Sequence, residues 1–397
     1  MKIGLLREGK NPPDRRVPFS PVQCKIILDT YSNISIFIQP SKIRCFPDLE
    51  YQKNGVSVQE DLSDCNIIMG VKEVPVNMLI DNKIFLFFSH TIKKQPYNQK
   101  LLKTIISKNI QLIDYETLVD ENNKRIIGFG RYAGIVGAYN SFLAYGKKSK
   151  TYDLKFPQLL NSKKELEAEL LKVKLPKDFK IILTGGGRVA SGVTEILKIL
   201  NIKEIEKDAF LNTNTNQPSY VQLMPIDYHK KQDGSFSSKN DFYNNPNKYE
   251  SSLLDFCFQG DMLITGHYYH PNSPVLLSKE DMQSRFFNLK VIGDISCDIA
   301  GPIASTIRPS TIEDPLYGYN RFLDQEDNYM KEEVVVVMAV DNLPCSLPKD
   351  SSSDFGNVFI HHVLQDLIEM GPVSMKGSIT LNGSLTDRFR YLSDYVS

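Results

Sequence analysis

The sequence predicts an α/β protein with mainly parallel β-sheets covered by helices, divided into two halves. Over the first 130 residues, apolar runs of strand length alternate with polar stretches of helical length. A second strand, turn and helix unit begins near residue 179. Alternation of this kind is typical of parallel sheets, because parallel strands need a crossover connection. At 397 residues, the chain is long enough for two domains that each bury a core.

In the first half, five short apolar runs are the predicted strands. They are residues 2–6, 34–38, 66–70, 83–88 and 110–113. The segments between them carry the polar residues of surface helices. We therefore expect one mainly parallel sheet with helices on its faces.

In the second half, residues 179–184 form a β-rich run that leads directly into three glycines. Beyond the glycines, Val193, Ile196, Leu197 and Leu200 recur at helical spacing, which predicts an amphipathic helix. Further strands are expected at 262–265, 289–295 and 334–340, and helices at 163–174 and 361–370. Residues 203–250, rich in Asn, Lys, Asp and Tyr, are expected to be an excursion outside the core.

Charge and cysteine content narrow the class of protein. The 47 Lys and Arg residues balance the 47 Asp and Glu residues, so we expect small-molecule partners and neither a nucleic acid nor a membrane. Charge interrupts the first residues too early for a signal-peptide core, and no apolar run has the length of a membrane span. The six cysteines include no CxxC pair, which favours reduced thiols and a cytoplasmic location.

The glycine turn is the clearest candidate binding motif. Gly185 permits a tight bend, Gly187 lets the backbone approach a pyrophosphate, and Ala190 occupies the small-residue position of a dinucleotide-binding fingerprint. The following helix N-terminus offers free N–H groups to phosphates. The alternative is a glycine-rich turn without a ligand. Three acids lie near the spacing expected for a group that binds the ribose of NAD, and the spacing does not choose among them: Glu204, Glu206 and Asp208.

Three basic residues of the first half are candidates for proton transfer or substrate binding. Lys72 and His90 each follow a predicted strand, and open α/β sheets bind ligands at the carboxyl ends of their strands. Taken singly, a solvated lysine and a histidine bonded to a nearby carbonyl are the favoured alternatives. Arg16 has the fork geometry that clamps a carboxylate, although its spacing alone favours a surface arginine.

Two further groups lie in the second half. Asp294 and Asp298 close a predicted strand, and Asp298, in the loop, is better placed to meet a cofactor or substrate. A structural cap is an equally weighted alternative. His267 and His270 are three residues apart, but no CxxC, HExxH or carboxylate cluster accompanies them, so we expect no metal.

Taken together, several segments resemble the alanine dehydrogenase and saccharopine dehydrogenase superfamily, and most closely its lysine-ketoglutarate reductase branch. The similar segments of the first half are 7–10, 15–18, 70–75, 89–93, 114–116 and 129–134. Those of the second half are 269–274, 294–298, 311–315 and 340–344. The last two segments are more typical of the reductase branch. The resemblance covers nearly the whole chain except the region near 203–240.

The resemblance implies two Rossmann-like domains with mainly parallel sheets flanking a cleft. Residues 1–130 with 350–397 would form the substrate-binding domain, and 131–349 the dinucleotide-binding domain. Lys72 and His90 would be the acid/base pair, with Glu116 as an acid that either supports this pair from behind or relays protons. The implied substrate-binding residues are Arg16, Arg131 and Lys93. The implied cofactor-binding residues are Gly185, Gly186, Gly187, Arg188, Val189, Asp298 and Asn342.

The implied activity is that of a lysine-2-oxoglutarate reductase, which interconverts lysine plus 2-oxoglutarate with saccharopine through an imine. The cofactor would be NAD or NADP, and the sequence leaves the choice open because Arg188 follows the glycines and no single ribose-binding acid stands out. Two alternatives remain. One is an alanine-type amino-acid dehydrogenase that uses ammonia, and the other is a nucleotide-binding regulator without turnover.

Overall fold

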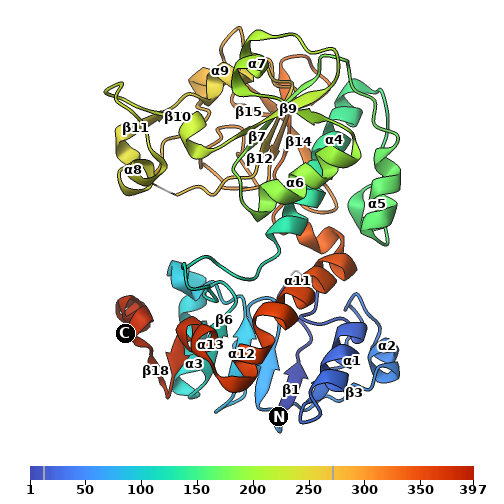
Figure 1. The fold of residues 1–397 in the computed structure, drawn as a ribbon, viewed down its shortest axis with the longest axis vertical. Helices are drawn as coiled ribbons and strands as arrows, with labels where there is room; N and C mark the ends of the chain where they lie inside the picture. Colours follow the sequence, from blue (N-terminus) through green and yellow to red (C-terminus); the bar gives the residue numbers. More distant parts are fainter. Residues whose placement is uncertain (12–13, 271) are drawn as a thin grey trace. The chain divides into compact units, whose positions relative to one another are not determined.

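The computed structural model describes residues 1–11, 14–270 and 272–397, which divide into two compact units. Unit 1 contains Met1–Phe129 and Pro348–Ser397, and unit 2 contains Gly130–Leu347 (Figure 1). Each unit is built on a mainly parallel sheet with helices on both faces. The predicted α/β class is therefore confirmed.

The sheet of unit 1 has six parallel strands in the order β3-β2-β1-β4-β5-β6. The strands are β1 (Lys2–Leu5), β2 (Ser35–Ile38), β3 (Ser57–Val58), β4 (Ile67–Met69), β5 (Ile84–Phe87) and β6 (Gln111–Asp114). All five predicted strands are present, and only the two-residue β3 was not expected. The strand order reverses between β1 and β4, which makes this point the expected ligand position of a doubly wound sheet.

Helices cover both faces of this sheet. On one face lie α1 (Pro21–Thr30), α11 (Pro348–His362) and α12 (Leu364–Glu369), and on the other α3 (Gln99–Ser107) and α14 (Ser393–Val396). Two further short helices are α2 (Asp48–Lys53) and α13 (Pro372–Gly377), and β17 (Thr380–Leu381) pairs with β18 (Ser384–Leu385). The helix expected at 361–370 is wrong as one element, because α11 ends at His362 and Val363 leaves the helical conformation before α12 begins.

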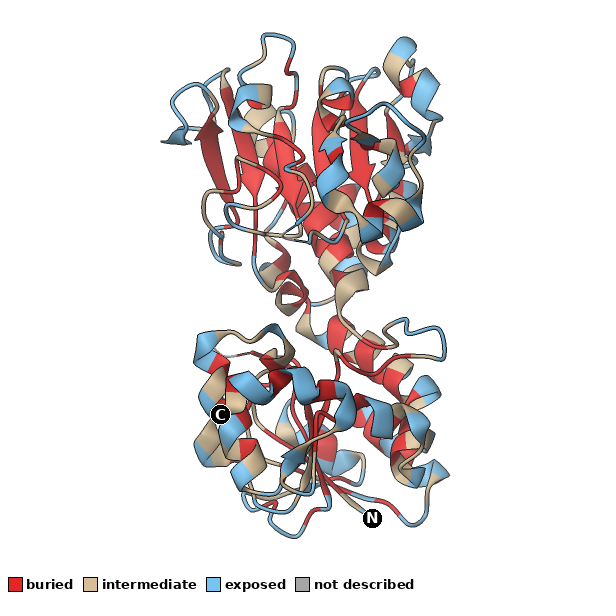
Figure 2. Cartoon of the chain, turned by 90° about the vertical axis from the view of Figure 1, so that its left-hand side faces the viewer, coloured by how far each residue is buried: buried red, intermediate tan, exposed pale blue. Residues whose placement is uncertain are grey.

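The sheet of unit 2 has eight strands in the order β15-β14-β16-β13-β12-β7-β9-β8. They are β7 (Lys180–Thr184), β8 (Lys203–Glu204), β9 (Ser219–Leu223), β12 (Met262–Thr265), β13 (Val291–Asp294), β14 (Leu316–Asn320), β15 (Gln325–Asp327) and β16 (Val334–Met338). Strand β14 runs antiparallel to both of its neighbours, and the other pairs are parallel. Nearly all of the longer strands are fully buried, as Figure 2 shows.

On one face of this sheet lie α4 (Gly130–Ser149), α5 (Lys163–Leu170) and α6 (Arg188–Ile199). On the other lie α7 (Lys207–Asn212), α9 (Leu253–Cys257) and α10 (Lys279–Met282). Helices α4 and α6 cross so closely that only glycine fits. A Cβ atom on Gly134 would lie 1.9 Å from the Val189 carbonyl oxygen, and one on Gly192 would lie 2.0 Å from the Arg131 oxygen.

Residues 203–250 are only partly the excursion that the sequence predicts. Strand β9 lies inside the sheet between β7 and β8, so for Ser219–Leu223 the expectation is wrong. The five-residue strand is flanked by polar segments that hide its pattern. Strand β8 is also part of the sheet, and α7 packs on its face. The later part of the region lies outside the sheet, as β10 (His229–Lys231), α8 (Lys239–Asn244) and β11 (Tyr249–Ser251), grouped at one side of unit 2 in Figure 1.

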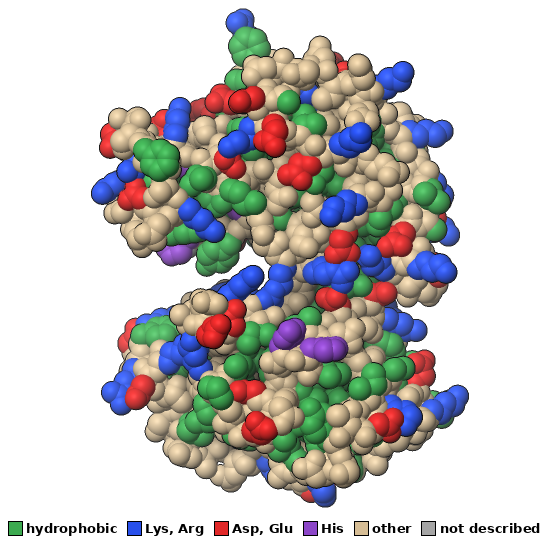
Figure 3. Space-filling view, viewed as in Figure 1, with side chains coloured by type: hydrophobic (Ala, Val, Ile, Leu, Met, Phe, Trp, Pro, Cys, Tyr) green, Lys and Arg blue, Asp and Glu red, His purple; other side chains and the backbone are tan. Residues whose placement is uncertain are grey.

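The surface carries mixed charge. Lys and Arg side chains are interspersed with Asp and Glu on the face of each unit that Figure 3 shows. Within 1–11, 14–270 and 272–397, none of the helices combines the length and the apolar character that a bilayer crossing demands.

Candidate active site

Four polar side chains of unit 1 follow the carboxyl ends of four strands. Glu8 follows β1, Lys72 follows β4, His90 follows β5, and Glu116 follows β6. Because the strands are parallel, these ends lie along one edge of the sheet, where doubly wound folds bind ligands. The structure thus brings the three predicted proton-handling residues to a common edge and adds Glu8, which the sequence reasoning missed.

His90 is held by a carboxylate. Its Nδ1 lies 2.7 Å from Oε1 of Glu73, and Oε2 of Glu73 accepts a hydrogen bond from Lys10 Nζ at 2.8 Å. Burial alone would raise the pKa of Glu73, but the hydrogen bonds from His90 and Lys10 lower this pKa to about 2. His90 has φ 52°, a left-handed conformation that is uncommon outside glycine and asparagine. Glu73 is therefore an anion at neutral pH, and it orients the imidazole. Its only sequence signal was its place beside Lys72.

The loop that carries Lys72 is anchored by Glu8. The Glu8 carboxyl accepts hydrogen bonds from the backbone N–H groups of Val71 (2.7 Å) and Lys72 (2.9 Å). Burial, and then the charge of Asp14, raises the pKa of Glu8 to about 7. Burial also lowers the pKa of Lys72, and the nearby charge of Arg16 lowers it further. Both groups are thereby shifted toward proton exchange at neutral pH.

Arg16 lies close to this site but is already paired. Its Nη2 and Nε donate to the two carboxylate oxygens of Asp14 at 2.6 and 3.0 Å, and both side chains are buried. Its guanidinium lies over the Phe129 ring, 4.1 Å from the centroid. Arg16, the predicted carboxylate binder, is therefore buried and is not the surface arginine that its spacing favoured. The Asp14 carboxylate balances its positive charge.

Glu116 lies between two cations. Its Oε1 accepts a hydrogen bond from Arg125 at 3.3 Å and lies 3.9 Å from Nζ of Lys93, whose side chain is 56% exposed. Its Oε2 is buried and has no hydrogen-bond partner among the described residues. An unpaired buried oxygen is costly, and a hydrogen-bond donor that reached it would remove this cost.

Buried Asp114 connects the ends of β5 and β6. One of its oxygens accepts from the Ser89 N–H at 2.9 Å and the other from the Glu116 N–H at 2.7 Å. Burial, and then the charge of Glu116, raises the pKa of Asp114. The carboxyl thus fixes the backbone on both sides of the site, next to His90 and at Glu116 itself.

In unit 2, the glycine turn has the shape that a pyrophosphate requires. Gly185 has φ 88°, and a Cβ atom there would lie 2.6 Å from the Gly266 oxygen. Apart from Gly187 and its chain neighbours, no heavy atom of the described residues lies within 4 Å of the position where Gly187 would carry a Cβ, so this part of the turn is open. Arg188 and Val189 begin α6, whose first N–H groups have no helical partner. These residues fit the phosphates of a dinucleotide.

The acids near the expected ribose-binding spacing are not beside this turn. Glu204 ends β8, and Glu206 and Asp208 follow it, but β9 separates β8 from β7. After β9 comes Asp227, which accepts from the Met224 N–H at 2.7 Å and pairs with Lys207. Strand β9 was not predicted from the sequence. For this reason the number of residues after the glycine turn did not identify one ribose-binding acid.

The other predicted contacts of unit 2 lie at or near the same carboxyl edge. Buried Asp294 accepts hydrogen bonds from three hydroxyl groups, at 2.6 to 2.7 Å, which makes it a structural group. Asp298 is half-buried in the loop after β13. Asn342 follows β16 in a left-handed conformation, with φ 68°. Arg131 forms a two-point ion pair with Glu195, at 2.5 and 2.8 Å, and its role in substrate binding stays a prediction.

His267 and His270 each have a hydrogen-bond partner at Nδ1. Nδ1 of His267 lies 2.6 Å from Oγ1 of Thr184, and Nδ1 of His270 accepts from the Asn272 N–H at 3.2 Å. Pro271, in one of the segments that carry the resemblance, lies outside the described residues. Within the described part of the chain, no three His, Cys, Asp or Glu residues are grouped as a metal site would require.

This chain is similar to known proteins in sequence and in fold. Residues 4–136 match the family described as alanine dehydrogenase/PNT, N-terminal domain. This part of the chain belongs to that family. The superfamily predicted from the sequence is thus confirmed.

Relatives cover almost the whole chain. It is 29% and 30% identical, over 98% of its length, to the mitochondrial alpha-aminoadipic semialdehyde synthases of Mus musculus and Rattus norvegicus. It spans about half of these relatives, 47% of each. It is also 25% identical to a saccharopine dehydrogenase (NAD(+), L-lysine-forming) of Schizosaccharomyces pombe, over 90% of this chain and 91% of that protein. The chain is therefore homologous to saccharopine dehydrogenases and to part of the alpha-aminoadipic semialdehyde synthases.

A solved L-alanine dehydrogenase has the same fold. Its structure covers 100% of both chains with a TM-score of 0.65 at 16% sequence identity. A transhydrogenase from Sinorhizobium meliloti matches 97% of this chain and 99% of its own, with a TM-score of 0.59 at 12% identity. At these identities the comparison concerns the fold alone.

Proposed function

We propose that the chain interconverts lysine plus 2-oxoglutarate with saccharopine, using NAD or NADP. In the forward direction, lysine, 2-oxoglutarate, NAD(P)H and a proton give saccharopine, NAD(P)+ and water. The observation that carries the proposal is the alignment of Lys72, His90 and Glu116 along one sheet edge of unit 1, with Glu73 fixing the imidazole. The names of the relatives support the choice of substrates.

We assign the cofactor to unit 2. The proposed contacts are the glycine turn, the start of α6, and two residues at the carboxyl edge of the sheet. They are Gly185, Gly186, Gly187, Arg188, Val189, Asp298 and Asn342. When bound, the nicotinamide would supply or accept the hydride. The chain's own part is to bind the phosphates on N–H groups and leave space for them at Gly187.

Imine formation needs proton transfer at two atoms. The attacking amine nitrogen of lysine must lose a proton, and the carbinolamine oxygen must gain one before it leaves as water. Lys72 and His90 are assigned to these transfers. Burial and Arg16 favour the neutral form of Lys72, while ionised Glu73 holds His90 through Nδ1 and leaves Nε2 for the reaction. Glu116 would pass protons at the same edge.

The two substrates bring three carboxylates, which need cations. Of the three candidate cations, Lys93, Arg16 and Arg131, Lys93 has the most exposed side chain. Arg16 is buried near Lys72. Binding to Arg131 would require a carboxylate to displace Glu195 from a two-point ion pair. Arg16 is held in the same way by Asp14, so we assign carboxylate binding first to Lys93, and Arg16 would bind a carboxylate only by sharing or exchanging Asp14.

Turnover with defined substrates tests the proposal. Purified protein is mixed with NADH or NADPH, 2-oxoglutarate and either lysine or ammonia, and cofactor oxidation is followed. Oxidation that requires lysine, and reduction of NAD(P)+ by saccharopine, are expected. Lys72→Met should lower kcat by about 100-fold or more, whereas the exposed control Lys53→Met should not. Oxidation only with ammonia and a 2-oxo acid would refute the lysine assignment.

The same assay also tests two other functions. The L-alanine dehydrogenase fold favours an alanine-type enzyme as the second candidate, which predicts turnover with ammonia and pyruvate. Tight cofactor binding without turnover of any amine would indicate a nucleotide-binding regulator.

We also propose a cytoplasmic location, because all six cysteines are free thiols. The mammalian relatives are named as mitochondrial, so imaging of the tagged chain with markers for both compartments is the test.

A further inference from the structure

The proposed reaction leaves one cavity of unit 1 without an occupant. Its volume of about 450 Å³ lies within the range of about 300–1,000 Å³ for small-molecule sites. Two segments line it, which are Arg7 with Glu8, directly after β1, and the loop that follows β2, residues 40–48. Because β1 and β2 are parallel neighbours in the sheet, the cavity lies at the same carboxyl edge as Lys72 and His90.

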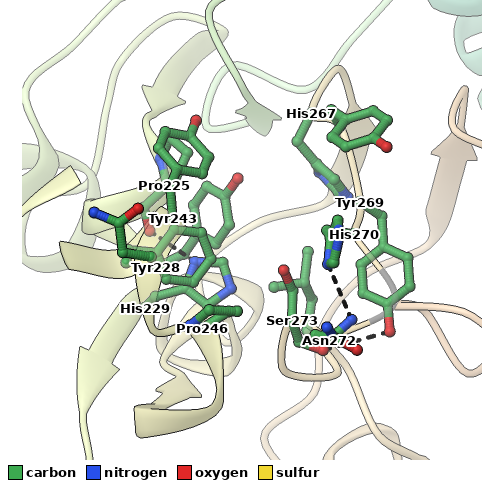
Figure 4. Close-up of a pocket in the computed structure, with 14 residues that line it drawn as sticks. Pro225, Tyr228, His229, Tyr243, Pro246, His267, Tyr269, His270, Asn272 and Ser273 are labelled. Carbon is green, nitrogen blue, oxygen red and sulfur yellow. Dashed lines mark hydrogen bonds between the residues drawn. The ribbon is translucent and has the colours of Figure 1, made fainter. Parts of the chain in front are cut away.

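The lining of this cavity carries both signs of charge. Arg7 and Lys42 supply cations, and Glu8 and Asp48 supply carboxyl groups. A cavity of about 370 Å³ in unit 2 differs, because none of the described residues that line it is Lys, Arg, Asp or Glu (Figure 4). In the unit 1 cavity, a dianion such as 2-oxoglutarate would face two carboxyl groups. A zwitterion, by contrast, can place an opposite charge against each sign.

The loop after β2 is held in shape by buried Arg44. The Arg44 guanidinium donates hydrogen bonds to Oδ1 of Asp48 at 2.8 Å and to the carbonyl oxygen of Gln39. The Arg44 N–H donates to the Ser41 hydroxyl at 3.2 Å, and the Ser41 N–H donates to the Asp48 carboxylate at 3.2 and 3.3 Å. The wall of the cavity is therefore formed before a ligand arrives, which lowers the entropic cost of binding.

Lys42 is the cation of this lining that no acid balances. Among the described residues, its ammonium has no ion pair and no hydrogen bond, whereas Arg7 forms a two-point ion pair with Glu60 at 2.8 and 2.5 Å. Lys42 can thus bind a carboxylate without breaking an internal pair. The Asp48 side chain is 30% exposed, and a carboxylate has about four lone-pair positions, so it can accept from an ammonium while it stays bonded to Arg44.

We propose that this cavity binds the α-amino and α-carboxylate groups of the lysine substrate, with Lys42 on the carboxylate and Asp48 on the ammonium. The inference rests on the proposed function, which supplies the substrate. Pro40 and Ile43 also line the cavity and offer apolar surface to the methylene groups of lysine. Lys42 and Asp48 thereby become the residues that select lysine over ammonia, which has no such groups.

The distances along the sheet edge suit this placement. Strand β1 pairs with β2 on one side and with β4 on the other, and neighbouring strands lie about 4.8 Å apart. Five bonds of about 1.5 Å separate Cα of lysine from its ε-nitrogen, which gives a reach of about 6 Å. A head group between the ends of β1 and β2 therefore directs the ε-amine toward the end of β4. Glu8 connects the two places, since it lines the cavity and accepts from the Lys72 N–H at 2.9 Å.

Steady-state kinetics of the full chain tests the proposal. Lys42→Met keeps the length of the side chain and removes its charge, so the KM for lysine should rise about tenfold. The kcat and the KM for 2-oxoglutarate should change by less than about twofold, because this contact is the same before and during the reaction. The matched control is Lys53→Met, an exposed lysine of α2 outside the cavity lining, which should change none of them. An unchanged KM for lysine in Lys42→Met would overturn the proposal.

Binding of lysine analogues tests the same contact without turnover. L-Norleucine keeps the head group and lacks the ε-amine, whereas 1,5-diaminopentane keeps the amine chain and lacks the carboxylate. Calorimetry should show that the full chain binds 1,5-diaminopentane at least about tenfold more weakly than L-norleucine. Lys42→Glu places an anion against the carboxylate and should reverse this preference. A preference that Lys42→Glu leaves unchanged would contradict the assignment.

The proposed function and the head-group site fail in different ways. Binding of L-lysine that depends on Lys42, without turnover, would remove the reaction and keep the site. Saccharopine turnover with a KM for lysine that Lys42→Met leaves unchanged would keep the reaction and remove the site. Neither binding nor turnover of lysine would remove both. Circular dichroism of each variant separates loss of a contact from loss of the fold.

Discussion

At the scale of single residues, the pH dependence of stability tests the charge of Glu73. Its pKa of about 2 in the folded protein lies below the ordinary 4.5. Its stabilising contribution is therefore complete above pH 4.5 and is lost as the pH falls toward 2. Glu73→Gln should lower the free energy of unfolding by on the order of 1–3 kcal/mol at pH 7. Urea titrations at pH 7, 4 and 3 check this, and a deficit that does not shrink with acid would contradict it.

Lys72 should behave in the opposite way. Burial lowers its pKa in the folded protein, so the ammonium destabilises the fold at every pH below its ordinary 10.5, and this cost disappears above that value. Lys72→Met should thus leave the free energy of unfolding at pH 7 unchanged or higher, even though turnover falls. Urea denaturation measures this, with Lys53→Met as the exposed control. A loss of stability greater than about 1 kcal/mol would show that Lys72 has a structural role instead.

At the scale of secondary-structure elements, two glycines of unit 2 separate packing from binding. Gly134→Ala would drive a Cβ atom into the Val189 carbonyl, so α4 and α6 must move apart, at a cost of about 1–3 kcal/mol or more. Gly187→Ala has open space around it and should leave stability unchanged, while the new methyl group blocks the pyrophosphate. Thermal unfolding and NADH titration of both variants check the pair. Undiminished NADH binding by Gly187→Ala would place the cofactor elsewhere.

The same elements show what the sequence could and could not predict. The long apolar strands and the glycine turn with its helix were found within one or two residues, because strong local patterns fix them. Strand β9 was missed because Ser219–Leu223 is short and lies between polar segments, and its burial comes only from pairing with β7. Because β9 was not predicted, the position of Asp227 after this strand could not be predicted either.

Within the candidate site, residue identity was predictable but pairing was not. Lys72 and His90 follow strands, which the sequence reveals. The sequence does not show that Glu73 pairs with His90, or that Asp14 pairs with Arg16. These pairs depend on the directions of the side chains, which residue spacing does not determine. Glu8 follows strand β1 as Lys72 follows strand β4, so its position after a predicted strand could have identified it from the sequence.

At the scale of the whole molecule, the course of the chain predicts which pieces fold alone. Unit 2 is one continuous segment, 130–347, with its own cores on both faces of its sheet. Unit 1 is discontinuous, and its second segment supplies core residues. Phe355 lies 5.0 Å from the ring of Tyr115, and Phe359 lies 5.4 Å from that of Phe19. Removal of residues 348–397 would therefore uncover much of one face of the unit 1 sheet, under α11 and α12, and part of the other, under α14.

We accordingly expect 130–347 to unfold cooperatively in urea when expressed alone, and 1–129 to remain unfolded. Joining 1–129 to 348–397 through a short glycine-serine linker should restore a folded unit 1, since the Phe129 and Phe355 rings stack 4.6 Å apart and place the two ends near each other. Far-UV circular dichroism across a urea series measures all three fragments. A cooperative transition for 1–129 alone would contradict this expectation. It would show that residues 1–129 form a complete core without the helices of 348–397.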